Sequence, residues 1–215
     1  MKMKSSLIIA PLYSIGVITL LALVLALPST RAIYEQCTEA HPFIMGFLKF
    51  ALLATAGELF AVRISTKKWA FPCYIGIRLL IWGIIGAWIT YMMKVFGGGI
   101  DCLMLGSLLP GYGSRFLRAF YISATMNLSF GPTFMALHKY SDCLLQRRHD
   151  GQSCSLQEVA NAIDWCGFIK FTLLKTIPLF WIPAHTVTFL LPDAYQVTVA
   201  ALLSVALGII LSAKK

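Results

Sequence analysis

Charged residues are scarce in this chain. Asp, Glu, Lys and Arg together make up 13% of its 215 residues, whereas hydrophobic residues make up 58%. A soluble globular domain carries about 25% charged residues, so an ordinary water-soluble fold is excluded. No GxSxG, HExxH or P-loop motif is present and no nucleophile–base set stands out, so the sequence does not indicate an enzyme.

Paired cysteines are also missing. None of the six cysteines belongs to a CxxC motif, which excludes a zinc knuckle and a dithiol redox motif. The cysteines are scattered along the chain, and we interpret them as small packing residues. Cys37 and Cys102 are the one pair expected on the same outer side of a membrane, so a disulfide between them stays open. No metal site and no cofactor are expected.

Long apolar segments are what the chain has in abundance. A hydrocarbon core ~30 Å thick is crossed by about 20 residues of helix. The apolar runs are continuous rather than alternating, which predicts helices and not a barrel. We therefore predict an all-α, polytopic transmembrane helix bundle that forms a single integral membrane domain over residues 1–215. Its six expected spans are Leu7–Leu27, Phe43–Ile64, Phe71–Phe96, Phe116–His138, Cys166–Leu191 and Ala194–Ser212.

The beginning of the chain resembles a signal peptide, because two lysines precede an apolar run. The segment Thr30-Arg31-Ala32 is a poor cleavage site, however, and the run Leu7–Leu27 is long enough to span. We therefore expect an uncleaved first helix.

Two connections differ from the apolar segments. The residues between Gly97 and Arg115 are rich in glycine and include the turn signal Pro110-Gly111, which predicts a loop or a short interfacial piece. Residues 141–164 are expected to form a polar loop that contains a short amphipathic helix. Ser155 and Glu158 form a capping box, which marks the start of that helix.

The net charge is +9, from 18 Lys and Arg against 9 Asp and Glu. No basic stripe with interleaved aromatic residues is present, so nucleic acid is not an expected partner. Basic residues instead gather in the cytoplasmic loops of membrane proteins. Ten lie on one side of the predicted topology and four on the other, which places both termini on the cytoplasmic or matrix side. The ten are Lys2, Lys4, Arg63, Lys67, Lys68, Lys139, Arg147, Arg148, Lys214 and Lys215, and the four are Arg31, Lys94, Arg115 and Arg118.

Two ionisable residues lie deep within predicted spans. Glu58 is six residues from the inner end of the second span, and Arg78 is seven residues into the third. At ~1.5 Å per residue both are about 10 Å deep, where an unpaired charge is costly. Because a short loop joins the two helices, we predict a Glu58–Arg78 ion pair. The pair either locks the hairpin alone or lines an aqueous path, and both interpretations stay open.

The fifth span contains Pro178 and Pro183, with His185 nearby, and each proline is expected to kink the helix. A kinked packing helix is the first interpretation, and a binding site is the second. Lys49 points away from Glu58 and is expected to snorkel toward the outer surface.

Three further polar residues are candidates for a pore or cavity. Asn127 lies within the fourth span, and His138 and Asp142 follow at its end. His138 and Asp142 are four residues apart and can face one another, which at a helix end is usually a local hydrogen bond.

The last span carries a stripe of small residues at Ala200, Ser204, Gly208 and Ser212, each four residues from the next. Such a stripe allows two helices to approach closely, within one chain or between copies. The expected partners are therefore the lipid bilayer and, as an open alternative, a second copy of the chain.

Three blocks of residues occur in order along roughly half of the chain. They are His41-Pro42 with Ala56-Gly57-Glu58, then Arg115-x-x-Arg118 with Phe130-Gly131-Pro132, His138-Lys139-Tyr140 and Asp142, and then Trp181-Ile182-Pro183 with Phe189, Pro192 and Tyr195. In this order they resemble the Mpv-seventeen and peroxisomal twenty-two-kilodalton membrane protein family. The chain departs from that family at Glu58, Thr188 and Gln196, where the family usually has Asp, Asn and Arg.

The resemblance implies a small helical membrane protein that acts as a pore or channel for small solutes. We therefore expect a small-solute channel. A non-transporting scaffold that binds partners through the small-residue stripe and residues 141–164 is the alternative, and a substrate-binding transporter subunit is a third possibility. The expected location is a bacterial cytoplasmic membrane, or an organelle membrane if the source is eukaryotic.

Overall fold

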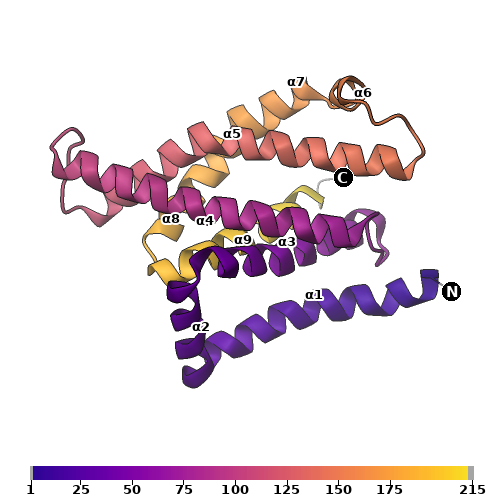
Figure 1. Ribbon diagram of the computed structural model, residues 1–215, viewed down its shortest axis with the longest axis horizontal. Coiled ribbons are helices and arrows are strands. Elements are labelled where there is room, and N and C mark those ends of the chain that lie inside the picture. The colour runs from indigo at the N-terminus through magenta and orange to yellow at the C-terminus, as the bar shows by residue number, and fades with distance from the viewer. Residues whose placement is uncertain (1, 213–215) are drawn as a thin grey trace. The chain divides into compact units, whose positions relative to one another are not determined.

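The computed structural model describes residues 2–212, with side chains from residue 8 to residue 207, and helix is its regular secondary structure throughout that range (Figure 1). The all-α prediction is therefore confirmed. The helices are α1 (Lys2–Ala26), α2 (Pro28–Ala40), α3 (Pro42–Thr66), α4 (Ile75–Leu105), α5 (Arg115–His149), α6 (Leu156–Asn161), α7 (Trp165–Gly167), the π-helix η1 (Phe168–Trp181), α8 (Ile182–Phe189) and α9 (Asp193–Ser212).

Four helical segments are long and apolar enough to cross a membrane. They are Ile8–Ala26, Pro42–Thr66, Ile75–Leu105 and Trp165–Phe189. These segments match the first, second, third and fifth predicted spans. Helix α9 is also apolar, but the part with described side chains, Asp193–Leu207, is shorter. This set of helices is consistent with an integral membrane protein.

The chain divides into two compact units. Unit 1 contains Met1–Tyr91 and Asp193–Lys215, and unit 2 contains Met92–Pro192. Helix α4 runs through the boundary, so its first half belongs to unit 1 and its second half to unit 2.

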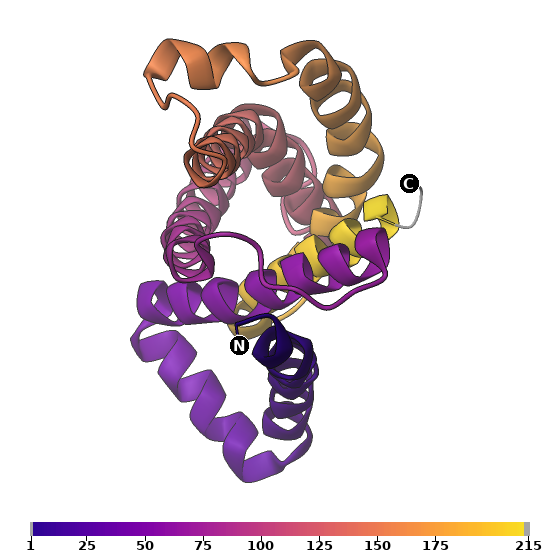
Figure 2. The ribbon, with the colours of Figure 1, turned by 90° about the vertical axis from the view of Figure 1, so that its right-hand side faces the viewer.

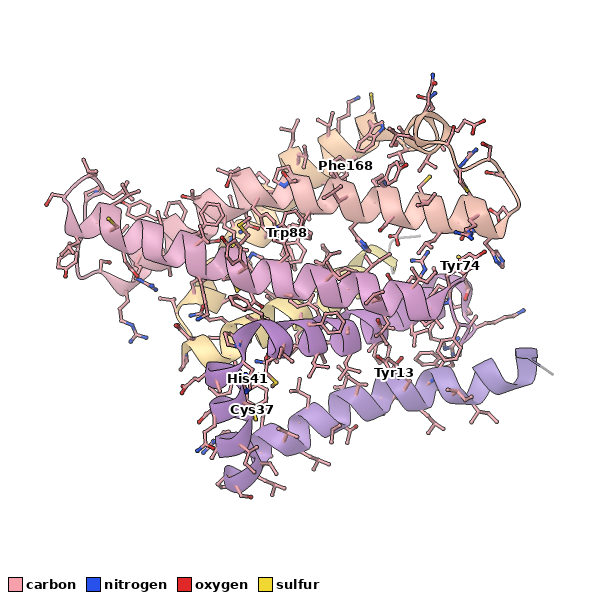
Figure 3. The ribbon with its side chains drawn as sticks, in the orientation of Figure 1. Tyr13, Cys37, His41, Tyr74, Trp88 and Phe168 are labelled. Carbon is pink, nitrogen blue, oxygen red and sulfur yellow. The ribbon has the colours of Figure 1, made fainter. Side chains whose placement is uncertain are left out.

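In unit 1, α3 is the central helix and carries buried apolar residues such as Phe50 and Leu59. Helix α1 runs antiparallel to α3, and α2 crosses between their ends (Figures 1 and 2). Both α2 and α3 begin with a proline, a residue that suits the first turn of a helix because no N–H is needed there. Tyr13 of α1 points toward α3 and donates a hydrogen bond to the Leu52 carbonyl, at 3.2 Å (Figure 3).

Glycines allow α3 to approach its neighbours in unit 1 at backbone distance. A Cβ atom on Gly86 of α4 would lie 2.4 Å from the carbonyl oxygen of Gly46 on α3. On the other side of α3, a Cβ atom on Gly57 would lie 3.0 Å from Val205 of α9. Small residues thus set the helix spacing, as is usual when helices pack in lipid.

Part of the small-residue stripe of α9 can be followed in the structure. Ala200 is buried, and Ser204 is half-buried with its hydroxyl donating to the Ala201 carbonyl at 2.6 Å. Gly208 and Ser212 fall on the part of α9 whose side chains lie outside the described residues.

The expectation that Lys49 snorkels to the surface is wrong. Its side chain is buried, and its ammonium group donates to the Thr38 hydroxyl at 3.0 Å and to the Ala194 carbonyl at 3.2 Å. The same group lies 4.4 Å from the ring centroid of Tyr34. Helix α2 and the start of α9 supply these acceptors, so the charge is satisfied inside unit 1 rather than at its surface. Burial also raises the pKa of the Tyr34 phenol.

In unit 2, the long helix α5 packs against α8 and η1. Ser114 caps α5, because its hydroxyl accepts a hydrogen bond from the Leu117 N–H at 3.3 Å. The predicted kinks of the fifth span take a different form. Residues Phe168–Trp181 are a π-helix that contains Pro178, and the helix becomes regular at Ile182, with Pro183 in the first turn of α8.

Both predicted connections are shorter than expected. Helix α4 continues through Gly97 to Leu105, because Ile100 and Met104 bury apolar surface in unit 2, which offsets the about 1 kcal/mol that each glycine costs a helix. Likewise, α5 continues to His149 because Leu145 is buried. The loops that remain are residues 106–114, 150–155 and 162–164, and α6 starts after the expected Ser155 cap.

Candidate functional site

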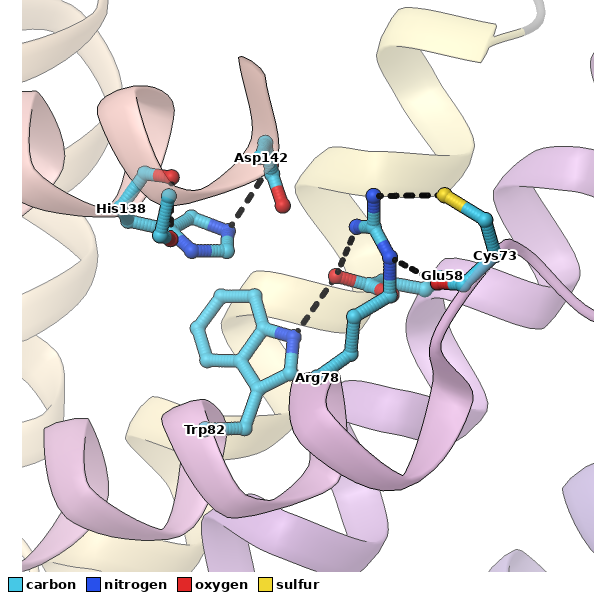
Figure 4. Close-up of polar contacts among 7 residues, drawn as sticks. Glu58, Cys73, Arg78, Trp82, His138 and Asp142 are labelled. Atoms are coloured by element: carbon cyan, nitrogen blue, oxygen red, sulfur yellow. Dashed lines mark hydrogen bonds and ion pairs between the residues drawn. The ribbon is translucent and has the colours of Figure 1, made fainter. Parts of the chain in front are cut away.

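The ion pair predicted between Glu58 and Arg78 is present in unit 1 (Figure 4). An Nη atom of Arg78 lies 3.6 Å from a carboxylate oxygen of Glu58. The two side chains come from neighbouring antiparallel helices, α3 and the first turns of α4. The prediction of this pair from depth and helix order is therefore confirmed.

The loop between α3 and α4 brings the two residues together. Lys67 ends α3 in the left-handed conformation, with φ at 60°, and Tyr74 precedes α4 with φ at 54°. Arg63 donates a hydrogen bond to the Lys67 carbonyl, which closes the end of α3. This tight connection makes α3 and α4 an antiparallel hairpin, so residues near its turn end face each other.

Two further residues complete the polar cluster around the ion pair. Trp82 donates its indole N–H to the same Glu58 oxygen at 2.8 Å, and Arg78 donates to the Cys73 carbonyl at 2.9 Å (Figure 4). Sequence reasoning missed both. Trp82 is four residues after Arg78, which places both on one face of α4, and this spacing is the signal that was available.

The cluster is neither sealed nor fully open. The exposed fraction of the side chain is 17% for Glu58 and 11% for Arg78. Carboxylate and guanidinium are each fixed by a second partner, so their charges have defined positions. Such a fixed pair of opposite charges can bind water or a small polar solute.

A second polar cluster lies in unit 2, where Asn127 of α5 meets His185 of α8. The Asn127 amide nitrogen donates to the Ser123 carbonyl at 2.8 Å and lies 3.0 Å from Nδ1 of His185. Both side chains are buried. The Ser123 hydroxyl donates to the Ile182 carbonyl at 2.7 Å, just before Pro183. The structure thus brings together Asn127 and His185, which the sequence indicated separately.

The remaining candidates of unit 2 form local contacts. Nε2 of His138 lies 3.5 Å from Asp142 one turn later on α5, which is the local interaction expected for this spacing (Figure 4). Pro183 lies in the first turn of α8, which continues from η1 without a break, so the helix lacks one backbone donor there. Sequence reasoning missed the two-point contact between Arg118 and Asp101, at 2.5 and 2.8 Å.

All six cysteines, Cys37 and Cys102 among them, are free thiols. The disulfide that the sequence left open is therefore not formed.

Comparisons with family models, with curated proteins and with solved structures find no match for this chain. The family resemblance therefore rests on the three sequence blocks themselves.

Proposed function

We propose that this protein is a six-span membrane channel for small solutes. Helix lengths support two spans beyond the four apolar ones. The 35 residues of α5 correspond to ~52 Å, and the 20 residues of α9 to ~30 Å, at the usual helical rise. Within α5, Arg118 and His138 bracket 19 less polar residues, which is close to the length that a hydrocarbon core requires.

The arrangement of unit 1 supports the proposal that both termini face the cytoplasm or matrix. Helix α9 runs parallel to α3, because Ala194 lies at Lys49 and Val205 lies further along at Gly57. Helix α1 runs the opposite way, so it starts at the end of unit 1 where α3 and α9 finish (Figure 1). Lys67 and Lys68 follow α3 at that end, in agreement with the positive-inside rule.

The partly exposed Glu58–Arg78 pair is the observation that carries the proposed function. Ionisable groups at membrane depth are costly unless they pair or face water. The two groups pair with each other, and 17% of the Glu58 side chain and 11% of the Arg78 side chain stay exposed. An ion pair whose only role is packing gains little stability over apolar residues of similar size. We therefore assign the pair to the wall of a polar path along α3 and α4.

Unit 2 has a polar cluster of its own, which is buried. Asn127 is nine residues from Arg118 and eleven from His138, and is therefore close to the middle of the proposed span. Its partner His185 follows the change from π-helix to α-helix, and π-helical segments are frequent at functional sites. The family resemblance also supports a pore.

The test is conductance of the purified protein in planar bilayers. We expect discrete openings for the wild type and altered ion selectivity for Glu58→Gln, which keeps an acceptor for Trp82 but removes the charge. Glu39→Gln is the matched control, since Glu39 is an exposed carboxylate on α2. Selectivity that is the same in Glu58→Gln and wild type would count against the assignment of this residue to the path.

The alternative is a scaffold that transports nothing. Its partner surface would be the loop 150–155 with α6, which is exposed apart from a few residues. If folded protein in the bilayer shows no openings, and deletion of residues 150–155 abolishes capture of a partner, the scaffold replaces the channel. A bacterial cytoplasmic membrane and an organelle membrane both fit this proposal.

A further inference from the structure

The loop between α4 and α5 in unit 2 exposes large apolar side chains although it is not part of a span. Leu108 is 75% exposed and Tyr112 is 71% exposed. At its two ends, Leu105 is 68% exposed and Phe116 is 59% exposed. A loop in water normally carries polar residues, and exposed apolar groups gathered in one segment mark an interaction surface.

The loop holds these side chains in a defined conformation. The N–H of Leu108 donates to the Leu103 carbonyl at 2.9 Å, which prolongs the end of α4. Gly111 has a φ of 84°, in the left-handed region that residues with a side chain rarely adopt, so glycine is favoured in this turn. The Tyr121 hydroxyl donates to the Pro110 carbonyl at 3.4 Å. The conformation of the turn therefore keeps Leu108 and Tyr112 exposed.

Helix length places the loop relative to the bilayer. The 31 residues of α4 correspond to ~46 Å, against about 40–45 Å for a bilayer with its headgroup layers. Asp101, whose carboxylate meets Arg118 at the proposed start of the α5 span, lies only four residues, or ~6 Å, before the end of the helix at Leu105. Residues 106–114 then fall at the level of the headgroups rather than in bulk water.

The charges around the loop match a phospholipid surface. Residues 92–118 contain three basic side chains and one acidic side chain. Asp101 pairs with Arg118, and Arg115, whose guanidinium donates to the Leu190 carbonyl at 3.2 Å, adds a positive charge at the end of the apolar loop. Basic groups next to exposed Leu, Tyr and Phe form the pattern of segments that lie in the headgroup layer.

We propose that the α4–α5 loop is an interfacial anchor, whose residues Leu105, Leu108, Tyr112 and Phe116 insert among phospholipid headgroups while Arg115 binds lipid phosphates. The anchor fixes the outer end of the α4–α5 hairpin at the bilayer surface. It requires that α4 spans the membrane, but it does not require a channel.

The test uses spin labels on single cysteines at Leu108→Cys and Tyr112→Cys, in protein reconstituted into vesicles of phosphatidylcholine and phosphatidylglycerol. The background carries serine at the six native cysteines and is used only if its circular dichroism matches that of the wild type. Gln152→Cys, in the exposed polar loop 150–155, is the matched control. Collision with oxygen, which concentrates in lipid, is compared with collision with a water-soluble nickel chelate.

We expect labels at 108 and 112 to collide more with oxygen than the label at 152, and to be protected from nickel. Labels that collide with nickel as strongly as the control would overturn the proposal and leave the loop as a protein-binding surface. Hydroxyl-radical footprinting of the wild-type protein in the same vesicles is the parallel measurement. We expect protection of Tyr112, and its rapid oxidation would equally contradict the anchor.

Discussion

Replacement of Gly86 by alanine is expected to destabilise unit 1, although alanine is the better helix former. The new Cβ atom would lie 2.4 Å from the Gly46 carbonyl oxygen and 2.4 Å from Cβ of Phe50. The carbonyl belongs to the backbone and cannot rotate away, so α3 and α4 must move apart. Overpacking of this kind costs about 3 kcal/mol, and the helix preference of alanine returns about 1 kcal/mol. We therefore expect a net loss of about 2 kcal/mol.

The assay is the unfolding midpoint of purified protein in a fixed detergent, followed by circular dichroism. Gly98→Ala is the matched control, because Gly98 lies on the same helix and nothing lies within 4 Å of its new Cβ atom. We expect Gly98→Ala to unfold at or above the wild-type midpoint and Gly86→Ala to unfold below it. If Gly86→Ala matches Gly98→Ala, the close contact of α3 with α4 is refuted.

Three more predictions follow from unit 1 and from α6. Arg78→Gln should destabilise by about 2 kcal/mol because it leaves a largely buried carboxylate, and the double variant with Glu58→Gln should recover part of that loss in the same assay. Lys49→Met should leave the unfolding midpoint unchanged or raise it. The substitution removes a buried ammonium group that has no carboxylate partner among the described residues. A large fall in the midpoint would contradict this expectation. Hydrogen bonds from Ser153 and Ser155 lower the pKa of Glu158, so the cap of α6 is fully formed above the ordinary carboxyl pKa of 4.5 and weakens as the pH falls through the lowered value. Amide exchange in α6 should therefore rise on acidification, relative to the exchange expected for an unfolded chain, and this rise should vanish in Glu158→Gln.

Where the sequence pattern was strong, prediction from the sequence succeeded. Uncharged or nearly uncharged runs identified α1, α3 and α4, because a span needs about 20 apolar residues in succession. A short polar connection made α3 and α4 antiparallel neighbours, and helical rise alone then placed Glu58 level with Arg78. The ion pair could be predicted because it depends only on depth and adjacency.

Prediction failed where partners come from segments distant in sequence. Helix α2 is polar and lacks a long apolar run, so nothing indicated that Thr38 would receive the ammonium group of Lys49. Ala194 is 145 residues from Lys49, and no local pattern reports such a contact. The extension of α4 past Gly97 was missed because the local preferences of glycine and turn residues predict a loop. Burial of Ile100 and Met104 stabilises the helix against those preferences.

The most direct test of the channel is the reversal potential of single openings under a salt gradient, measured for the wild type and for two opposite charge variants. If Glu58 and Arg78 line the path, Glu58→Gln leaves the guanidinium and shifts selectivity toward anions. Arg78→Gln leaves the carboxylate and shifts selectivity toward cations. Opposite shifts are the predicted result, and equal reversal potentials in all three proteins would contradict the account.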